Sequence, residues 1–489
     1  MTLKYLFLNN EILLLYIIII WVIIYFIEVY IYKFKFNNYM IFLVLIFLLV
    51  LLKNLIFNSI SINEFTYYFN NYFIYNNFIV NIKIIMIMIL IFYLIFFYSY
   101  NIIITVPIFE FVLLILISFL GLQIIIISNN LFIIFLFLEL VNLCIYCLIG
   151  LNKYSNLGIE IAYKYFIQSA YSTIIGFFAL SLIYISLGTL FINEIGLLLM
   201  NNIDLFSYIG IYLLILSIFF KLGLFPLHSW IADLYQGSFI IVTLYVATIP
   251  KIAYIFLFLK LLLEFNFIIN NFSLLIAFIT ILYGSIIALY QTNLRRLIAY
   301  GSMVHTGFII YSMSLYSLDG ISSAFFYLLF YILLVYFLFG FILFLYEINE
   351  DKNTFLIENI SQIGIILKVN KLITILFSFV LFSFAGLPLF IGFVSKWNIF
   401  LSLILYKKYI ELFLLILISV LSLVYYIRII RFLFFYEIKD KKVKIIINLN
   451  NVNLLLITII FIFILNILLI FYHSIIYLYI LKNILYTIS

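Results

Sequence analysis

The sequence predicts an all-α polytopic membrane protein. Of its 489 residues, 69% are hydrophobic and only 9% are charged, a balance that domains folded in water do not have. Mean hydropathy is +1.37. Apolar runs recur along the whole chain, and many reach the roughly 20 residues that a helix needs to cross a bilayer. The net charge of +7 is therefore explained by orientation in a membrane rather than by nucleic-acid binding.

Polar breaks divide the chain into about fourteen candidate transmembrane helices. They are predicted at residues 12–32, 40–58, 82–99, 106–128, 130–150, 162–191, 207–229, 239–263, 272–290, 297–317, 321–346, 371–400, 409–435 and 452–481. The first range lacks the small-residue cleavage site of a signal peptide, so we expect it to span the membrane. The longest predicted connections are 59–81, 347–370 and 436–451, and we find no soluble domain or nucleotide-binding fingerprint.

Lysine and arginine residues indicate the sides of the membrane. Fourteen of the 25 lie near connections that follow odd-numbered helices, among them Arg295 and Arg296, which are interpreted as loop charges. Seven, including Lys83, lie on the opposite side. Because basic residues favour the inner side, the odd-numbered connections are predicted inside and both termini outside. The other four lie within predicted helices and need another explanation; they are Lys164, Lys221, Lys251 and Lys396.

The segment from Phe219 to Lys251, FFKLGLFPLHSWIADLYQGSFIIVTLYVATIPK, concentrates polar residues in an otherwise apolar chain. A lysine inside a membrane helix costs about 2.5–3.5 kcal/mol. Pro226 removes a backbone donor and breaks the helix. The freed carbonyls are tolerated at membrane depth only when they are buried in protein or face a water-filled cavity. Lysines on both sides of this break, Lys221 and Lys251, therefore predict a site for moving protons or ions.

A weak internal repeat relates the two halves of the chain. Lys221 precedes Pro226 in the seventh predicted helix, and Lys396 follows Gly386-Leu-Pro388 in the twelfth. Broken helices at corresponding positions of inverted repeats are typical of transport sites. The predicted division is residues 1–105 with three helices, 106–264 as a first five-helix repeat, 265–436 as a second, inverted five-helix repeat, and 437–489 as a loop and the last helix.

Glu139 and His305 are two further ionisable groups inside predicted helices. Glu139 is either a structural ion-pair partner or the group that tunes Lys164 or Lys221. Desolvation disfavours the charged form of a lysine and a nearby carboxylate favours it, so a lysine balanced between the two can exchange protons near neutral pH. His305, with an unperturbed pKa near 6.5, suits a relay. A structural role stays open for each of three residues. Lys164 could extend its charged end to the membrane surface, and Lys396 could anchor one half of a broken helix. His305 could serve only as a hydrogen-bonded structural residue.

Four other residues are weaker candidates for a functional site. Cys144 and Cys147 form an isolated C-x-x-C in an apolar run and are interpreted as apolar filler. His228 is expected to line an entrance, and His473 is expected to be structural. The sequence shows no metal-ligand spacing, no haem or iron–sulfur motif and no serine triad, so no metal and no cofactor are expected in this chain.

The segment FKLGLFPLHSWIADLYQGS resembles the signature of the antiporter-like subunits of respiratory complex I. Within that family, Asp233-Leu-Tyr235-Gln-Gly237 and the lysine at position 396 favour the group of subunit 2 and bacterial subunit N over subunit 4. Further matches, which extend the resemblance over roughly residues 106 to 435, are 160–166, 300–307 and 385–396. The A-P-T-P-V-T stretch usual in the family is replaced by Ser238-Phe-Ile-Ile-Val-Thr243, which leaves the helix break expected there open.

The resemblance implies proton translocation driven by redox chemistry in other subunits. The residues it implies are Glu139 and Lys221 as the input pair, Lys164 close by, Lys251 and His305 as the central relay, and Lys396 as the outer element. It assigns NADH, flavin, iron–sulfur clusters and ubiquinone to partner subunits. It also implies a place in the mitochondrial inner membrane, beside neighbouring antiporter-like subunits and lipids.

Three other interpretations stay open. A subunit of a multi-subunit sodium/proton antiporter would carry the same motifs. A structural spacer in a membrane assembly would retain the charges without using them. An independent secondary transporter would function when expressed alone.

Overall fold

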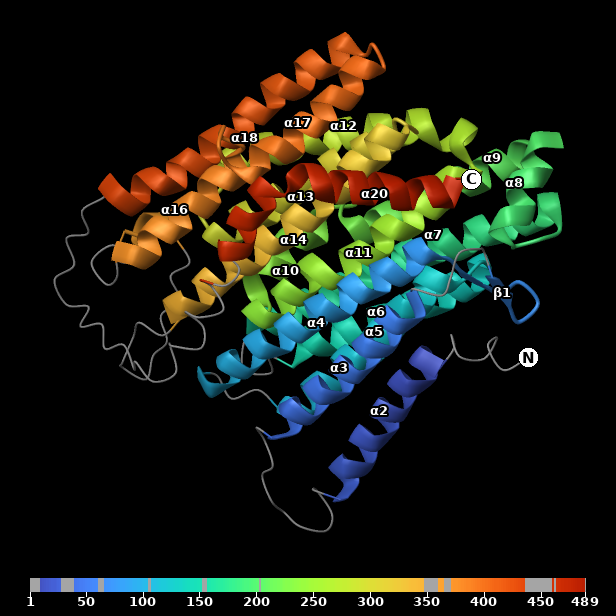
Figure 1. Cartoon of the computed structure of the whole chain (residues 1–489), viewed down its shortest axis with the longest axis horizontal. Helices are drawn as coiled ribbons and strands as arrows, with labels where there is room; N and C mark the ends of the chain where they lie inside the picture. Colours follow the sequence, from blue (N-terminus) through green and yellow to red (C-terminus); the bar gives the residue numbers. More distant parts are fainter. Residues whose placement is uncertain are drawn as a thin grey trace. The chain divides into compact units, whose positions relative to one another are not determined.

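The computed structural model describes residues 9–27, 39–59, 66–103, 107–151, 156–201, 204–346, 359–364, 371–435, 460 and 463–488 (Figure 1). The predicted connection 436–451 and most of 347–370 lie outside these residues. Helices dominate the described part of the chain, which confirms the predicted fold class.

The helices follow the predicted apolar runs closely. In chain order they are α2 (Asn9–Ile27), α3 (Tyr39–Ser59), α4 (Asn77–Ile103), α5 (Ile108–Ile127), α6 (Leu131–Gly150), α7 (Asn156–Leu187), α8 (Ile192–Asn201), α9 (Leu205–Leu222), α10 (Ser229–Gly237), α11 (Ile240–Glu264), α12 (Asn266–Tyr290), α13 (Leu294–Met313), α14 (Leu318–Tyr346), the 3-10 turn η2 (Ile360–Gln362), α16 (Lys371–Ala385), α17 (Ile391–Leu405), α18 (Tyr409–Phe435) and α20 (His473–Ile488). Among the described residues, nine helices are long and apolar enough to cross a membrane. The count of fourteen is not confirmed, because the remaining predicted ranges hold shorter, more polar or bent helices.

Two predicted spans are broken where the sequence indicated. The range 207–229 is helical only as far as Leu222, the end of α9, and α10 begins at its last residue, Ser229. The range 371–400 divides into α16 and α17. Each break begins at a glycine with positive φ, +71° at Gly223 and +82° at Gly386, a conformation that costs other residues free energy. The break between α10 and α11 also forms, although no proline is present, because Ser238 adopts an extended backbone.

Sequence analysis missed two short features. Helix α8 lies between the predicted sixth and seventh spans. A two-stranded antiparallel hairpin, β1 (Thr66–Tyr68) and β2 (Phe73–Tyr75), occupies the predicted 59–81 connection. Its turn places Phe69, Asn70 and Asn71 at positive φ without any glycine. No hairpin signal was therefore visible in the sequence.

The described fold comprises two compact units. The first contains residues 1–221, 249–269 and 486–489, and the second contains residues 222–248 and 270–485. Within the first, α6 packs against α5 and α7, neighbours coloured in adjoining blue and green shades in Figure 1. Within the second, α16, α17 and α18 pack against one another. The two units are defined by which residues lie close in space, and this does not test whether the sequence contains a repeat. The predicted repeat boundaries at 106–264 and 265–436 therefore stay a prediction.

Lys83 is not the surface charge that the topology argument assumed. It lies on α4 with only 1% of its surface exposed and forms an ion pair with Glu11 of α2. The Lys83 ammonium nitrogen also lies 3.3 Å from the hydroxyl oxygen of Tyr75 in the hairpin. The interpretation was wrong because a lysine near a helix end has the same sequence context whether it faces water or a buried partner.

We expect Glu11→Leu to reduce the yield and the melting temperature of the assembled protein, because it leaves the Lys83 charge buried without its counterion, a loss of about 3–5 kcal/mol in proteins. The double variant Glu11→Leu/Lys83→Met removes both charges and is expected to recover most of that stability. The measurement is thermal unfolding of the purified assembly. Equal stability of the single and double variants would contradict the assignment.

Candidate functional site

The predicted site residues divide between the two compact units. Glu139, Lys164, Lys221 and Lys251 belong to the first unit. His305 and Lys396 belong to the second. The predicted relay from Lys251 to His305 joins residues of different units and stays a prediction.

Lys221 occupies the last turn of α9 and is 5% exposed. Its ammonium group donates to the side-chain oxygen of Asn142 at 2.9 Å. The side-chain nitrogen of Asn142 donates in turn to the Glu139 carboxylate at 3.0 Å. The expected Glu139–Lys221 pair is therefore bridged by an amide, and among the described residues the two charged groups form no direct ion pair.

Helix α6 supplies a polar stripe toward this site. Its N-cap residue Asn130 accepts from the backbone N–H of Phe132 at 2.9 Å, which fixes where the helix begins. Glu139, Asn142 and Tyr146 then recur at three- and four-residue spacing, so they share one face. Tyr146 forms a hydrogen bond with Ser169 of α7. This spacing was visible in the sequence and could have identified Asn142 as a partner of Glu139.

The other two lysines of the first unit differ in exposure. Lys164 leaves 48% of its side chain exposed and pairs with Glu160, one turn earlier on α7, at 2.6 Å. Lys251 follows Pro250 inside α11 and is 4% exposed. The structure thus places Lys251 in protein interior and Lys164 at a helix surface.

His305 lies on α13 and is 2% exposed. One ring nitrogen lies 2.7 Å from the hydroxyl oxygen of Tyr327 on α14. The other lies 3.1 Å from the hydroxyl oxygen of Tyr426 on α18. Both tyrosines were missed in the sequence because 42 tyrosines make any single one uninformative.

Lys396 lies on α17 and points back to the end of the preceding half-helix. Its ammonium group donates to the backbone oxygens of Ala385 at 3.0 Å and Phe384 at 3.5 Å, and to the hydroxyl of Ser422 at 3.2 Å. All three partners are uncharged. The carboxyl end of a helix carries partial negative charge, so the break stabilises the ammonium group without a carboxylate.

The geometry of the break explains why those carbonyls are available. The backbone N–H groups of Gly386 and Leu387 close the end of α16 by bonding to Ser383 and Phe382. This is the pattern of a Schellman cap, which leaves the last two carbonyls of the helix without backbone donors. The Lys396 ammonium group donates to these two carbonyl oxygens, those of Phe384 and Ala385.

Helix α18 carries partners of both His305 and Lys396. Ser422 and Tyr426 are four residues apart, so they lie one turn apart on the same face. The second unit therefore holds two buried hydrogen-bonded clusters, His305 with its tyrosines and Lys396 with Ser422, whose partners share one face of α18.

Arg295 and Arg296 are not loop charges, contrary to the sequence interpretation. Both lie in the first turn of α13, and Arg295 is 6% exposed. Arg295 donates to the backbone oxygen of Gln236 at 3.1 Å, and Arg296 pairs with Asp233 at 3.1 Å. They hold the short helix α10 against α13.

The weaker candidates His228, Cys144 and Cys147 take no part in the hydrogen bonds described above. His228 stacks on Phe225 and meets Tyr283 edge-on, with ring centroids 5.7 Å and 4.6 Å away. Cys144 and Cys147 are unpaired thiols on α6. In the part of the chain that the structure describes, no group of three or more His, Cys, Asp or Glu side chains could hold a metal ion. The expected absence of cofactors stays a prediction.

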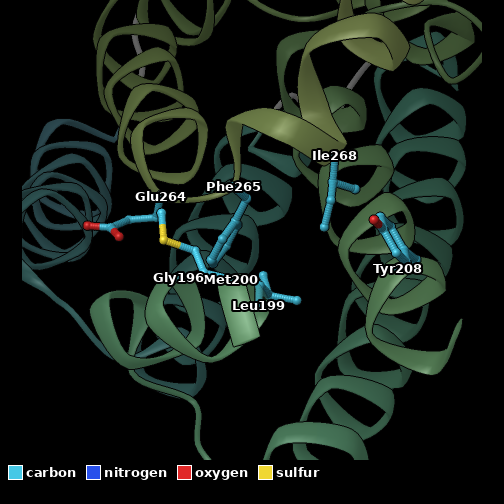
Figure 2. A pocket seen from close by; sticks show the side chains of 7 residues that line it. All are labelled: Gly196, Leu199, Met200, Tyr208, Glu264, Phe265 and Ile268. Carbon is cyan, nitrogen blue, oxygen red and sulfur yellow. The ribbon is translucent and has the colours of Figure 1, made fainter. Parts of the chain in front are cut away.

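A cavity of about 490 Å³ lies within the first unit, away from these groups. It is lined by residues of α8, α9, α11 and α12 and of the α11–α12 junction, namely Gly196, Leu199, Met200, Tyr208, Glu264, Phe265 and Ile268. Figure 2 shows Glu264 extending away from Tyr208 and Ile268. None of the six predicted site residues is among its lining residues.

The fold and the site define a polytopic membrane protein of the antiporter-like class, with buried lysines at broken helices. Residues 128–424 match the family described as NADH:quinone oxidoreductase/Mrp antiporter, TM. The chain belongs to this family.

Individual relatives agree with that assignment. NADH-quinone oxidoreductase subunit N of Azoarcus sp. (strain BH72) is 32% identical over 346 residues, which cover 68% of this chain and 69% of the relative. A chain of respiratory complex I from Thermus thermophilus matches with a TM-score of 0.76 at 19% identity, covering 96% of this chain and 98% of that one. A chain of the Mrp complex from Dietzia sp. DQ12-45-1b matches with a TM-score of 0.77 at 15% identity, covering 99% and 97%. The two structural matches show the shared fold.

We expect Gly386→Ala to displace the Lys396 ammonium group. A side chain at this positive φ is strained by roughly 1–2 kcal/mol, and its Cβ would lie 3.0 Å from the Lys396 side chain. The measurement is proton translocation by the assembled complex, which should fall while assembly is retained.

Gly150→Ala is the matched control, because a Cβ there would meet no atom within 4 Å. Equal translocation in the two variants would show that the break geometry at Gly386 does not matter to Lys396.

Proposed function

We propose that this chain is a proton-translocating membrane-arm subunit of an NADH:quinone oxidoreductase. The observation that carries the proposal is the placement of Lys221 and Lys396 at the two helix breaks, each buried and each held by uncharged hydrogen-bond acceptors. An ionisable group inside a membrane protein marks a proton or ion pathway by default. The relatedness to NADH-quinone oxidoreductase subunit N supports the kind of complex that we propose for this chain.

Each buried residue has a proposed role. Glu139 and Lys221, bridged by Asn142, form the input, with Lys164 at the neighbouring helix surface. Lys251 and His305 form the central relay. Lys396 forms the outer element, and Ser422, which accepts from it, lies one turn from the His305 partner Tyr426 on α18. The chain itself holds no redox centre in this proposal.

The partners follow from the same proposal. NADH, flavin, iron–sulfur clusters and ubiquinone bind to other subunits, and this chain contacts neighbouring antiporter-like subunits and lipids. We place it in the mitochondrial inner membrane, a proposal supported by a composition rich in Phe, Tyr, Ile and Asn that suits an AT-rich genome.

The alternative is a subunit of a multi-subunit sodium/proton antiporter, which the structural match to the Mrp complex favours. Separation of the source membranes on a native gel, with mass spectrometry of the band that holds this chain, distinguishes the two. Co-migration with flavin- and iron–sulfur-bearing subunits that oxidise NADH supports the oxidoreductase. Co-migration with antiporter chains alone supports the alternative.

We expect Lys221→Ala to reduce NADH-driven proton translocation about tenfold or more, because it removes a positioned proton-exchanging group. Lys482→Ala is the control, since Lys482 is exposed on α20 and has no role in the proposed proton pathway. The measurement is the pumping rate of the assembled complex in sealed vesicles, with assembly checked on a native gel.

Equal pumping by the two variants would defeat the assigned role of Lys221. If Lys221→Met and Lys396→Met both assemble and leave the number of protons pumped per NADH unchanged, the chain is a structural spacer instead.

A further inference from the structure

Asn142 bridges Glu139 and Lys221, but the function proposed above does not say why an amide stands between the two charged groups. It is 0% exposed on α6, in a helix whose neighbouring residues are almost all apolar. A buried amide in such a setting costs free energy unless its donor and acceptor are both satisfied. Both are satisfied here, and each by a charged side chain.

The orientation of the amide is specific. Its oxygen, the negative end of the dipole, accepts from the Lys221 ammonium group at 2.9 Å. Its nitrogen, the positive end, donates to the Glu139 carboxylate at 3.0 Å. The amide dipole therefore stabilises both charges at once and transmits the field of one to the other.

We infer that Asn142 is a positioning residue that couples Glu139 to Lys221 while keeping the two charges from forming a direct ion pair. This inference rests on the proposed function, because it concerns the pair assigned there as the input. A direct contact would place a full opposite charge at hydrogen-bond distance from the ammonium group, which favours the charged form of the lysine. An uncharged bridge instead leaves the lysine responsive to the carboxylate without holding it permanently as a cation.

The geometry of α6 accounts for the separation. Glu139 and Asn142 are three residues apart and share a face, while Lys221 comes from the last turn of α9. The Lys221 side chain meets this face at Asn142 and not at Glu139. The bridge thus follows from where α9 ends, at the break that begins with Gly223.

The test is a double-mutant cycle in the assembled complex, with pumping per NADH and pumping rate measured in sealed vesicles. Asn142→Leu keeps the shape of the side chain and removes both hydrogen bonds. We expect it to lower the pumping rate about tenfold, as loss of a hydrogen bond to a charged group does. Glu139→Gln/Asn142→Leu is expected to pump no more slowly than Glu139→Gln alone, because both changes break the same coupling.

Ser217→Ala is the matched control. Ser217 is buried on α9 one turn before Lys221, and its hydroxyl donates to the backbone oxygen of Leu214 in its own helix. Asn142→Leu pumping as well as Ser217→Ala would overturn the inference. Losses that multiply in the double variant would overturn it as well, because they would show a structural role independent of Glu139.

Asn142→Asp keeps the inference testable if Asn142→Leu does not assemble. The new carboxylate can pair directly with Lys221 and repels Glu139, so we expect assembly with a pumping loss of about tenfold. Pumping at the rate of the unmodified complex would overturn the inference. If Glu139→Gln and Lys221→Ala both pump normally, the proposed input pair fails instead, which separates the two conclusions.

Discussion

A lysine ammonium group inside hydrocarbon must find substitutes for the water that it loses, and the arrangement of this chain depends on how those substitutes are supplied. Lys396 receives backbone oxygens from the end of α16 and the Ser422 hydroxyl. Lys221 receives the Asn142 amide oxygen. In both cases the direct partner is uncharged, so the ammonium group is solvated without being fixed in an ion pair. In the proposed function, such a group gains and loses the translocated proton.

The two helix breaks reach this result by different routes. In the first, the lysine stands before the break, in the last turn of its own half-helix. In the second, the lysine stands after the break and reaches back to the end of the half-helix before it. A glycine at positive φ begins each break. What the two halves of the chain share is therefore a way of ending a helix inside the membrane, with different sources of hydrogen-bond acceptors.

The likeness to solved structures at 15–19% identity has a physical explanation. Helix positions depend on apolar length and on a few breaks, which many sequences satisfy. The acceptors around the lysines depend on individual side chains such as Asn142 and Ser422. Fold and site can therefore diverge at different rates, and the function must be argued from the site.

The sequence by itself determined the membrane class, the location of the nine membrane-spanning helices that the described residues contain and the two breaks at Pro226 and at Gly386-Leu-Pro388. It did so because hydropathy, proline and glycine act through the local backbone, without knowledge of distant neighbours. It also isolated the four lysines within helices.

Only the tertiary structure decided which groups those residues meet. Asn142, Tyr327 and Ser422 lie on other helices than Lys221, His305 and Lys396, and no local signal points from one helix to another. Lys83 and Arg295 were misread for the same reason. The sequence around a charge near a helix end looks the same whether that charge faces water or lies buried against a partner. Local chemistry specifies where the chain can cross and bend, whereas burial and pairing depend on which helices pack together.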